Sequence, residues 1–233
     1  MKIVVSDYDR TFYTEEETLK ENKKAVNMFR KQGNIFVFAT GRSYRDFKKE
    51  VSRYQLEYDY VILNHGALIL DQHDQILYHV EIDDSIMEGL QNLLRLRLCT
   101  DLFCCSGKES RLKITSPHLS KIHLEYSDDE IAREVECDVN ETYKNDVIAY
   151  HISDCKLEVV ASSVNKAYAI SLLAEKFRWD TSKVYTIGDG NTDLLMIRRF
   201  HGFRMKHSIS SLIPYAKGSY DAVFQIIYDI IKQ

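Results

Sequence analysis

The chain contains only two prolines among its 233 residues, so it has no proline-rich linker between its parts. No apolar run approaches the ~18–20 residues that a membrane-spanning helix needs, and the start lacks the apolar segment of a secretion signal. With a net charge of −4 there is no excess of positive charge. Neither nucleic acid nor an anionic membrane is therefore an expected partner.

The five cysteines are odd in number and gather in the middle of the chain. The adjacent Cys104 and Cys105 do not have the spacing of zinc ligands, so reduced thiols in a cytoplasmic protein are expected. Hydrophobic residues make up 45% and charged residues 28%, as in ordinary soluble globular proteins. A chain of this length can form one large domain or two unequal ones.

Two carboxylates follow the first apolar run of the chain. The run Ile3–Val5 leads into Asp7-Tyr8-Asp9-Arg10-Thr11, which reads as a buried strand that carries acidic residues at its carboxyl end. Ligands of open α/β sheets bind at that end. The pattern D-x-D-x-T is short, however, and an acidic surface turn would explain it equally well.

Partner motifs follow in order, each at the end of a strand or the start of a helix. The run 35–39 ends in Thr40-Gly41-Arg42, Lys166 opens an amphipathic stretch, and the strand 183–187 ends in Gly188-Asp189-Gly190-Asn191-Thr192-Asp193. Each has an ordinary explanation alone, such as a helix cap, a solvated lysine or a turn. Together and in this order they favour one site built from strand ends.

Strand and helix patterns alternate at both ends of the chain, which predicts right-handed crossovers and a parallel sheet. Residues 67–70 and 76–80 read as a hairpin. The middle differs, because it reads as two helices with about four strands, a compact α+β module. The expected elements there are a helix over 85–98, strands over 99–105 and 121–126, a helix over 129–143, and strands over 147–153 and 156–161.

These motifs resemble those of the haloacid dehalogenase-like phosphohydrolases, and among them the Cof-type group with a class IIB-like C2 cap. Asp7–Thr11 is similar to the first motif of the family, Thr40–Arg42 to the second, Lys166 to the third and Gly188–Met196 to the fourth. The resemblance also includes residues 65–69 and 157–166. It implies an α/β fold in which residues 1–82 and 163–233 form a Rossmann-like core with a parallel sheet. Residues 83–162 would form a smaller inserted α+β domain, here called the cap.

The resemblance implies a role for each motif residue. Asp7 would attack phosphorus and form an aspartyl-phosphate, and Asp9 would act as general acid and then general base. Mg²⁺ would lie between Asp7, the backbone carbonyl of Asp9 and Asp189, with Asp193 as a further ligand or the holder of a ligating water. The phosphate would be bound by Lys166 and Thr40, the backbone N–H groups around Thr11 and Gly41, and Thr192.

Three positions depart from the usual Cof-type pattern. Thr192 occupies the place of an asparagine that reaches toward the phosphate, so modified phosphate contacts are expected there. Ala167 follows Lys166 where glycine is usual, which eases helix formation. His65 stands where the group has asparagine before Gly66, and it has either a structural role or a contact with substrate.

The expected function is Mg²⁺-dependent hydrolysis of a small phosphate monoester, a sugar phosphate or similar metabolite, with the cap as a lid that selects the leaving group. A phosphomutase of the same fold and a catalytically silent protein that binds a phosphorylated ligand stay open as alternatives. A phosphoacceptor signalling domain would be half as long and would have no insertion. The oligomeric state is not evident. The cap residues that could contact an anionic or sugar-like leaving group are Arg95, Arg97, Lys108, Arg111, Lys113 and His118.

Overall fold

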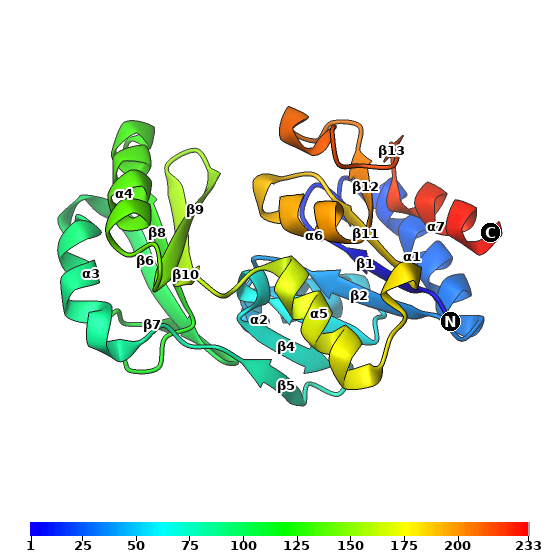
Figure 1. The fold of residues 1–233 in the computed structure, drawn as a ribbon, viewed down its shortest axis with the longest axis horizontal. Coiled ribbons are helices and arrows are strands. Elements are labelled where there is room, and N and C mark those ends of the chain that lie inside the picture. Colours follow the sequence, from blue (N-terminus) through cyan, green and yellow to red (C-terminus); the bar gives the residue numbers. More distant parts are fainter. Residues whose placement is uncertain (233) are drawn as a thin grey trace.

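The structure is a computed structural model that describes residues 1–232. It contains two sheets that lie side by side, joined by two chain segments (Figure 1). The first is an eight-stranded sheet in the order β13-β12-β11-β1-β2-β3-β4-β5. Its strands are β1 (Ile3–Ser6), β2 (Ile35–Ala39), β3 (Tyr60–Leu63), β4 (Leu68–Asp71), β5 (Ile76–His79), β11 (Val184–Gly188), β12 (His201–Met205) and β13 (Ser219–Tyr220).

The strands from β13 to β3 pair in parallel, and the expected hairpin of β4 and β5 adds an antiparallel edge. From β1 the chain proceeds through β2 and β3 toward one edge, and it later fills the other side of β1 with β11, β12 and β13. The strand order therefore reverses at β1, which is where ligands bind in open α/β sheets. The expectation of a mixed α/β fold with a parallel-dominated sheet is confirmed.

Helices cover both faces of this sheet because its strands alternate between two apolar cores. Val4 and Phe36 pack with residues of α1, α2 and α7, whereas Ile3 and Val5 pack with residues of α5 and α6. Gly33, with φ of 79°, follows the end of α1 as expected. The helices are α1 (Glu16–Lys31), α2 (Tyr44–Tyr54), α5 (Lys166–Phe177), α6 (Leu194–Arg199) and α7 (Val223–Lys232).

The cap contains a five-stranded antiparallel sheet in the order β7-β6-β8-β10-β9. One face packs on two helices through residues such as Cys104, Ile122 and Leu157. The other face is free of helices and carries Phe103, His123 and Glu158 in register across β6, β8 and β10. The elements are α3 (Met87–Leu93), α4 (Asp129–Thr142), β6 (Cys99–Ser106), β7 (Glu109–Leu112), β8 (Lys121–Tyr126), β9 (Val147–Ser153) and β10 (Lys156–Ala161).

The expected helix over residues 85–98 is wrong in its second half. Only α3 is α-helical, and a separate 3-10 turn covers Leu96–Leu98. Arg95 lies between them with a left-handed backbone, φ 44°, which ends the helix. Its guanidinium contacts Glu134 and Asp138 of α4, so the break joins the end of α3 to the second cap helix. The strand β7 was not expected.

Candidate active site

The motif residues meet at the carboxyl ends of the three central strands. Asp7 follows β1, Thr40 follows β2, and Asp189 follows β11. Lys166 comes from the first turn of α5 and reaches the same point. Because β11, β1 and β2 are neighbours in the sheet, residues about 180 positions apart in sequence share one site. The site lies in a cavity of about 520 Å³, whose opposite wall is formed by the cap.

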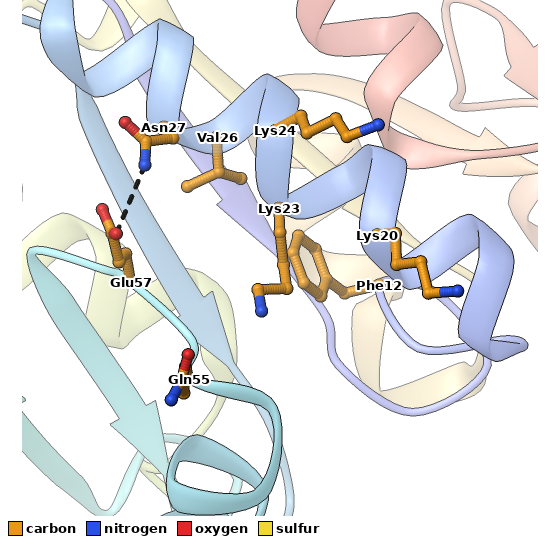
Figure 2. Close-up of a pocket in the computed structure, with 8 residues that line it drawn as sticks. All are labelled: Phe12, Lys20, Lys23, Lys24, Val26, Asn27, Gln55 and Glu57. Carbon is orange, nitrogen blue, oxygen red and sulfur yellow. Dashed lines mark hydrogen bonds between the residues drawn. The ribbon is translucent and has the colours of Figure 1, made fainter.

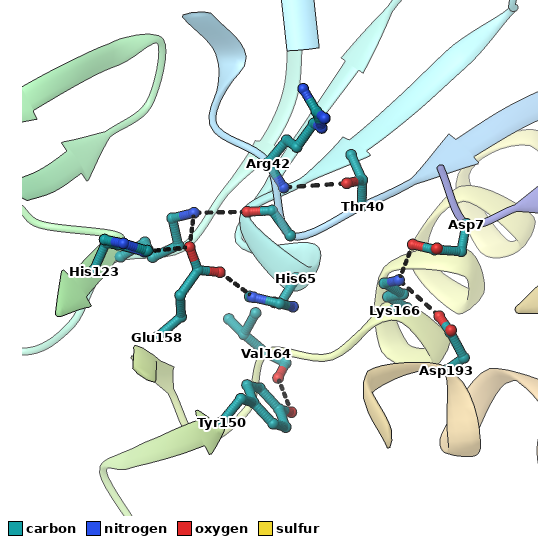
Figure 3. A network of polar contacts seen from close by, with 12 residues as sticks. Asp7, Thr40, Arg42, His65, His123, Tyr150, Glu158, Val164, Lys166 and Asp193 are labelled. Atoms are coloured by element: carbon teal, nitrogen blue, oxygen red, sulfur yellow. Dashed lines mark hydrogen bonds and ion pairs between the residues drawn. The ribbon is translucent and has the colours of Figure 1, made fainter. Parts of the chain in front are cut away.

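Lys166 joins two of the acidic residues. Its Nζ donates to Asp7 Oδ1 at 2.6 Å and to Asp193 Oδ1 at 2.7 Å, and its side chain is only 2% exposed (Figure 3). Asn165 caps α5 by accepting from the amide of Tyr168. A lysine at a helix start opposes the helix dipole, so the two carboxylates compensate for an otherwise unfavourable position.

Asp193 also shapes the turn that holds Asp189. Its Oδ2 accepts from the amides of Asp189 and Gly190 at 2.9 and 3.0 Å, while Asp189 Oδ1 accepts from the Thr11 hydroxyl at 2.9 Å. A Cβ on Gly188 would lie 2.4 Å from Asp193 Cγ, so only glycine fits at the end of β11. The fourth motif is thereby fixed by its own turn, and the Thr11 hydroxyl joins it to the first motif.

Burial governs the charges of this cluster. It raises the pKa of Asp7 well above the ordinary carboxyl value, although the nearby Lys166 opposes the shift. Burial and the charge of Asp193 likewise raise the pKa of Asp189. Burial disfavours the charge of Lys166, but Asp193 and Asp7 outweigh it and raise the pKa of Lys166 above that of a free lysine. Three buried carboxylates and one ammonium thus leave a surplus of negative charge.

That surplus suits a divalent cation. Each of Asp7, Asp189 and Asp193 offers an oxygen within 4.8 Å of the others, and all three residues are buried. An all-oxygen set of carboxylates is what Mg²⁺ prefers in proteins. The side chain of Asp9 is not among these oxygens, and the backbone carbonyl of Asp9 stays a predicted ligand.

Asp9 is held by an arginine whose role the sequence reasoning missed. Arg42 Nε and Nη2 donate to the two carboxylate oxygens of Asp9 at 2.8 and 2.7 Å, and its Nη1 lies 3.1 Å from Glu50 Oε1. Such a two-point contact fixes the plane of a carboxylate. Arg42 is the third residue of the Thr40-Gly41-Arg42 motif, so the signal was present in the sequence.

Four of the residues expected to bind phosphate line the same cavity: Lys166, Thr40, Gly41 and Thr192. Thr11 is not among the lining residues, and its amide donates to the Tyr8 carbonyl at 3.4 Å. Thr40 is buried, and its Oγ1 accepts from the amide of Arg42 at 3.1 Å. The amide of Gly41 donates to no protein acceptor within residues 1–232, so it can serve an anion. Thr192 lies in the 3-10 turn Asn191–Asp193, half-buried at the cavity wall.

A second buried charge cluster joins the cap to the core, and sequence reasoning did not find it. Glu158 Oε1 accepts from Lys121 Nζ at 2.6 Å and contacts His123 Nδ1 at 3.0 Å, while Oε2 contacts His65 Nε2 at 2.5 Å (Figure 3). Lys121 also donates to the Gly41 carbonyl at 2.6 Å. The only sequence signal was a glutamate inside the apolar run of residues 157–160.

In this cluster His65 contacts Glu158 of the cap, and it also lines the active-site cavity. Burial lowers its pKa, so a neutral ring donates its Nε2 proton to Glu158. Burial opposes the charge of Glu158, but Lys121 and the two imidazoles keep the pKa of Glu158 well below its ordinary value. The ring also packs against Gly41, where a Cβ would lie 2.4 Å from His65 Cε1.

Another cavity, of about 320 Å³, lies beside α1 and is lined by three lysines (Figure 2). Lys20 and Lys24 pair with Glu17 and Glu21 at 2.9 and 2.7 Å, and Lys23 donates to the Tyr54 carbonyl. These lysines are therefore satisfied, and no carboxylate cluster accompanies them. The cavity at the strand ends is the candidate active site.

Among residues 1–232, no helix is both long and apolar enough to cross a membrane.

Comparison with known proteins identifies the family of this chain. The family model of the haloacid dehalogenase-like hydrolases matches residues 4–117 and 105–222. The 5-amino-6-(5-phospho-D-ribitylamino)uracil phosphatase YbjI of Escherichia coli is 21% identical, covering 100% of this chain and 97% of its own. The phosphatase of the same name from Bacillus subtilis, YcsE, is 24% identical over 85% of this chain and 80% of its own.

Among solved structures, the subclass IIB sugar phosphatase BT4131 superposes with a TM-score of 0.81. It is 14% identical and covers 99% of this chain and 100% of its own, so it supports the fold. The family match extends over nearly the whole chain and includes every motif that meets in the cavity. This protein therefore belongs to the haloacid dehalogenase-like hydrolases, with a Cof-type arrangement of core and cap.

Proposed function

We propose that this enzyme is a Mg²⁺-dependent phosphatase that hydrolyses a small phosphate monoester, sugar phosphate-like, through an aspartyl-phosphate on Asp7. The observation that carries the proposal is the meeting of Asp7, Lys166, Asp189 and Asp193 at one buried point, where a nucleophile, a cation and an all-oxygen metal cluster coincide. The relatives support the substrate class, because YbjI and YcsE are named for a substrate that carries its phosphate on a ribityl chain.

In the first half of the reaction an Asp7 oxygen attacks phosphorus while the bond to the leaving oxygen breaks. Arg42 donates to both oxygens of Asp9, so Asp9 must first release at least one of these hydrogen bonds and take up a proton. The protonated Asp9 then gives its proton to the leaving oxygen, so the leaving group departs as an alcohol. In the second half a water attacks the aspartyl-phosphate and Asp9 takes up the proton that water loses. Asp7 is then a carboxylate again, and phosphate leaves.

The anions can meet only where positive charge surrounds them. Lys166 contacts Asp7 directly and faces the position of the transferred group, while the Thr40 hydroxyl and the Gly41 amide offer hydrogen bonds to phosphate oxygens. Asp7, Asp189, Asp193 and the Asp9 carbonyl would hold Mg²⁺. When bound, the ion neutralises charge on the phosphate and on the transition state.

The test is release of inorganic phosphate from a panel of monoesters with Mg²⁺, for wild type, Asp7→Asn and Asp9→Asn. Asp7→Asn should abolish turnover because the amide is isosteric but a poor nucleophile. Asp9→Asn should lose about 10²–10⁴-fold because general acid–base catalysis is removed. Unchanged phosphate release in both variants would contradict the assigned roles. Phosphate moved to a second hydroxyl, without release, would indicate a mutase instead.

A further inference from the structure

The cap wall of the active-site cavity shows which leaving group it can accept. Phe103, His123 and Glu158 stand in one row across the helix-free face of the cap sheet, and Lys121, His151 and Ile152 complete the wall. The His151 Nε2 atom lies 2.7 Å from Asp129 Oδ1, so this imidazole already has a carboxylate partner. Of the six cap residues that the sequence singled out for an anionic or sugar-like ligand, none lines the cavity. Arg95, Arg111 and His118 pair with carboxylates of the cap or its connection. The Arg111 guanidinium also lies 4.2 Å from the centroid of the Phe103 ring, and its partner there is Asp101 at 3.1 Å.

Each lysine and arginine side chain that lines the cavity is already paired with a carboxylate. Arg10, Arg42, Lys121 and Lys166 each lie within 3.6 Å of a carboxylate oxygen, and six carboxylates line the cavity against these four side chains. Lys121 is the only one of the four in the cap. Its side chain is 2% exposed, and its ammonium group donates hydrogen bonds to Glu158 and to the Gly41 carbonyl. A negatively charged leaving group would lose its hydration here without gaining an unpaired cation.

The wall does offer a positioned neutral contact. His123 is held on one side by Glu158, which accepts from Nδ1 at 3.0 Å, and by its ring stacking on Phe103 at 4.5 Å between centroids. Nε2 has no protein partner among residues 1–232, and the side chain is 12% exposed at the cavity. Ile152, 38% exposed, adds carbon surface nearby. A fixed imidazole beside an apolar side chain suits a hydroxyl-bearing carbon chain.

We propose that the cap wall is a subsite for an uncharged, hydroxyl-bearing leaving group, contacted by His123, and that Glu158 excludes anionic leaving groups by neutralising Lys121. This proposal rests on the phosphatase function proposed above. It assigns to Glu158 a role in specificity that acts through two neighbours, Lys121 and His123.

A matched pair of substrates tests the charge preference. Glucitol 6-phosphate and 6-phosphogluconate have the same open chain, but the second carries a carboxylate at the end far from phosphate. The wild type should show a kcat/KM for glucitol 6-phosphate that is higher by roughly tenfold or more. Equal values, or a preference for the carboxylate, would overturn the proposal.

Two variants separate the residues. Glu158→Gln keeps the shape but leaves Lys121 uncompensated, so the ratio should move about tenfold toward 6-phosphogluconate, and adding Lys121→Met should reverse that shift. His123→Phe should raise KM for glucitol 6-phosphate more than it changes kcat, with the exposed His73→Phe as control. If Glu158→Gln does not fold by circular dichroism, Lys121→Met tests the charge assignment instead. In that variant Glu158 is left without its ammonium partner, so the ratio should move further toward glucitol 6-phosphate.

An unchanged substrate ratio in folded Glu158→Gln, or an unchanged KM in His123→Phe, would overturn the corresponding assignment. Failure of the proposed function looks different. In that case the wild type releases no phosphate from either ester or from phenyl phosphate, which contradicts both the phosphatase function and the subsite.

Discussion

Lys166 is the residue on which the charge balance of the active site depends. It is the only cation in direct contact with Asp7 and Asp193 among the described residues, and all three side chains are buried. Removal of one partner from a buried ion pair is more damaging than the pair is stabilising, because an uncompensated charge stays behind.

Lys166→Met should therefore destabilise the metal-free protein by roughly 3–5 kcal/mol, since methionine fills the space but leaves two carboxylates unpaired. Mg²⁺ should restore part of that loss and raise the melting temperature of the variant more than that of wild type, because the ion supplies the missing positive charge. Thermal unfolding with Mg²⁺ and with EDTA measures both effects. The exposed Lys183→Met is the control. A variant as stable as wild type in EDTA would contradict this account of the cluster.

At the scale of elements, the sequence was most informative where a strand ends. The apolar runs 3–5, 35–39 and 183–187 predicted central strands, and their polar continuations predicted which residues would share one edge of the sheet. Asp7, Thr40 and Asp189 do lie there. Side-chain partners across the sheet could not be predicted. Arg42 with Asp9 and Lys121 with Gly41 are contacts between loops or sheets whose distance depends on the folded geometry.

The cap was less predictable because its signals are local and weak. The apolar residues of 85–98 recur without an interruption that would mark the end of a helix. Arginine is also not a residue type that indicates a left-handed backbone, although Arg95 has one. In that backbone conformation the Arg95 guanidinium contacts Glu134 and Asp138, which lie about 40 residues later in the sequence. Tertiary contacts therefore outweighed helix propensity at this position.

The turn after β11 yields an element-scale prediction with a matched control. In Gly188→Ala the new Cβ would lie 2.4 Å from Asp193 Cγ, so Asp193 must move away from Lys166 and from the amides it accepts. The cost should be about 1–3 kcal/mol, as for overpacked sites, together with a large loss of phosphatase activity. In Gly190→Ala the nearest atom would be 3.9 Å away, so stability should change little. Urea unfolding of both variants checks the contrast, and equal effects would contradict it.

At the scale of the whole molecule, one buried ionised carboxylate joins the core to the cap, beside apolar contacts such as that of Ala67 with Val160. Glu158 binds His65 from the core and Lys121 from the cap, and Lys121 in turn binds the Gly41 carbonyl beside the phosphate site. The relative position of lid and active site is thus coupled to the charge state of this cluster. Hydrogen bonds to a charged group are among the stronger ones in proteins.

The cluster makes stability sensitive to acid. Burial lowers the pKa of His65 below its ordinary 6.5. As the pH falls below 6.5, His65 is therefore protonated in the unfolded chain before it is protonated in the folded protein, which destabilises the folded protein. Glu158 has its pKa lowered from the ordinary 4.5, so its contribution is present above 4.5 and is lost as the pH falls through its folded value. Both shifts act in the same direction, so the contribution of this cluster to stability should fall as the pH drops below about 6.5. The raised pKa values of Asp7 and Asp189 in the active site act in the opposite direction, so the histidine part has to be measured by difference.

His65→Asn isolates the histidine part, because asparagine does not titrate and is the residue that the Cof-type pattern usually has there. The melting temperature of wild type should fall more between pH 7.5 and 5.5 than that of His65→Asn, since only wild type carries the histidine that resists protonation. The exposed His73→Asn serves as control and should follow wild type. Parallel curves for wild type and His65→Asn would show that the buried imidazole does not control the junction, and Glu158 would then have to be held by Lys121 and His123.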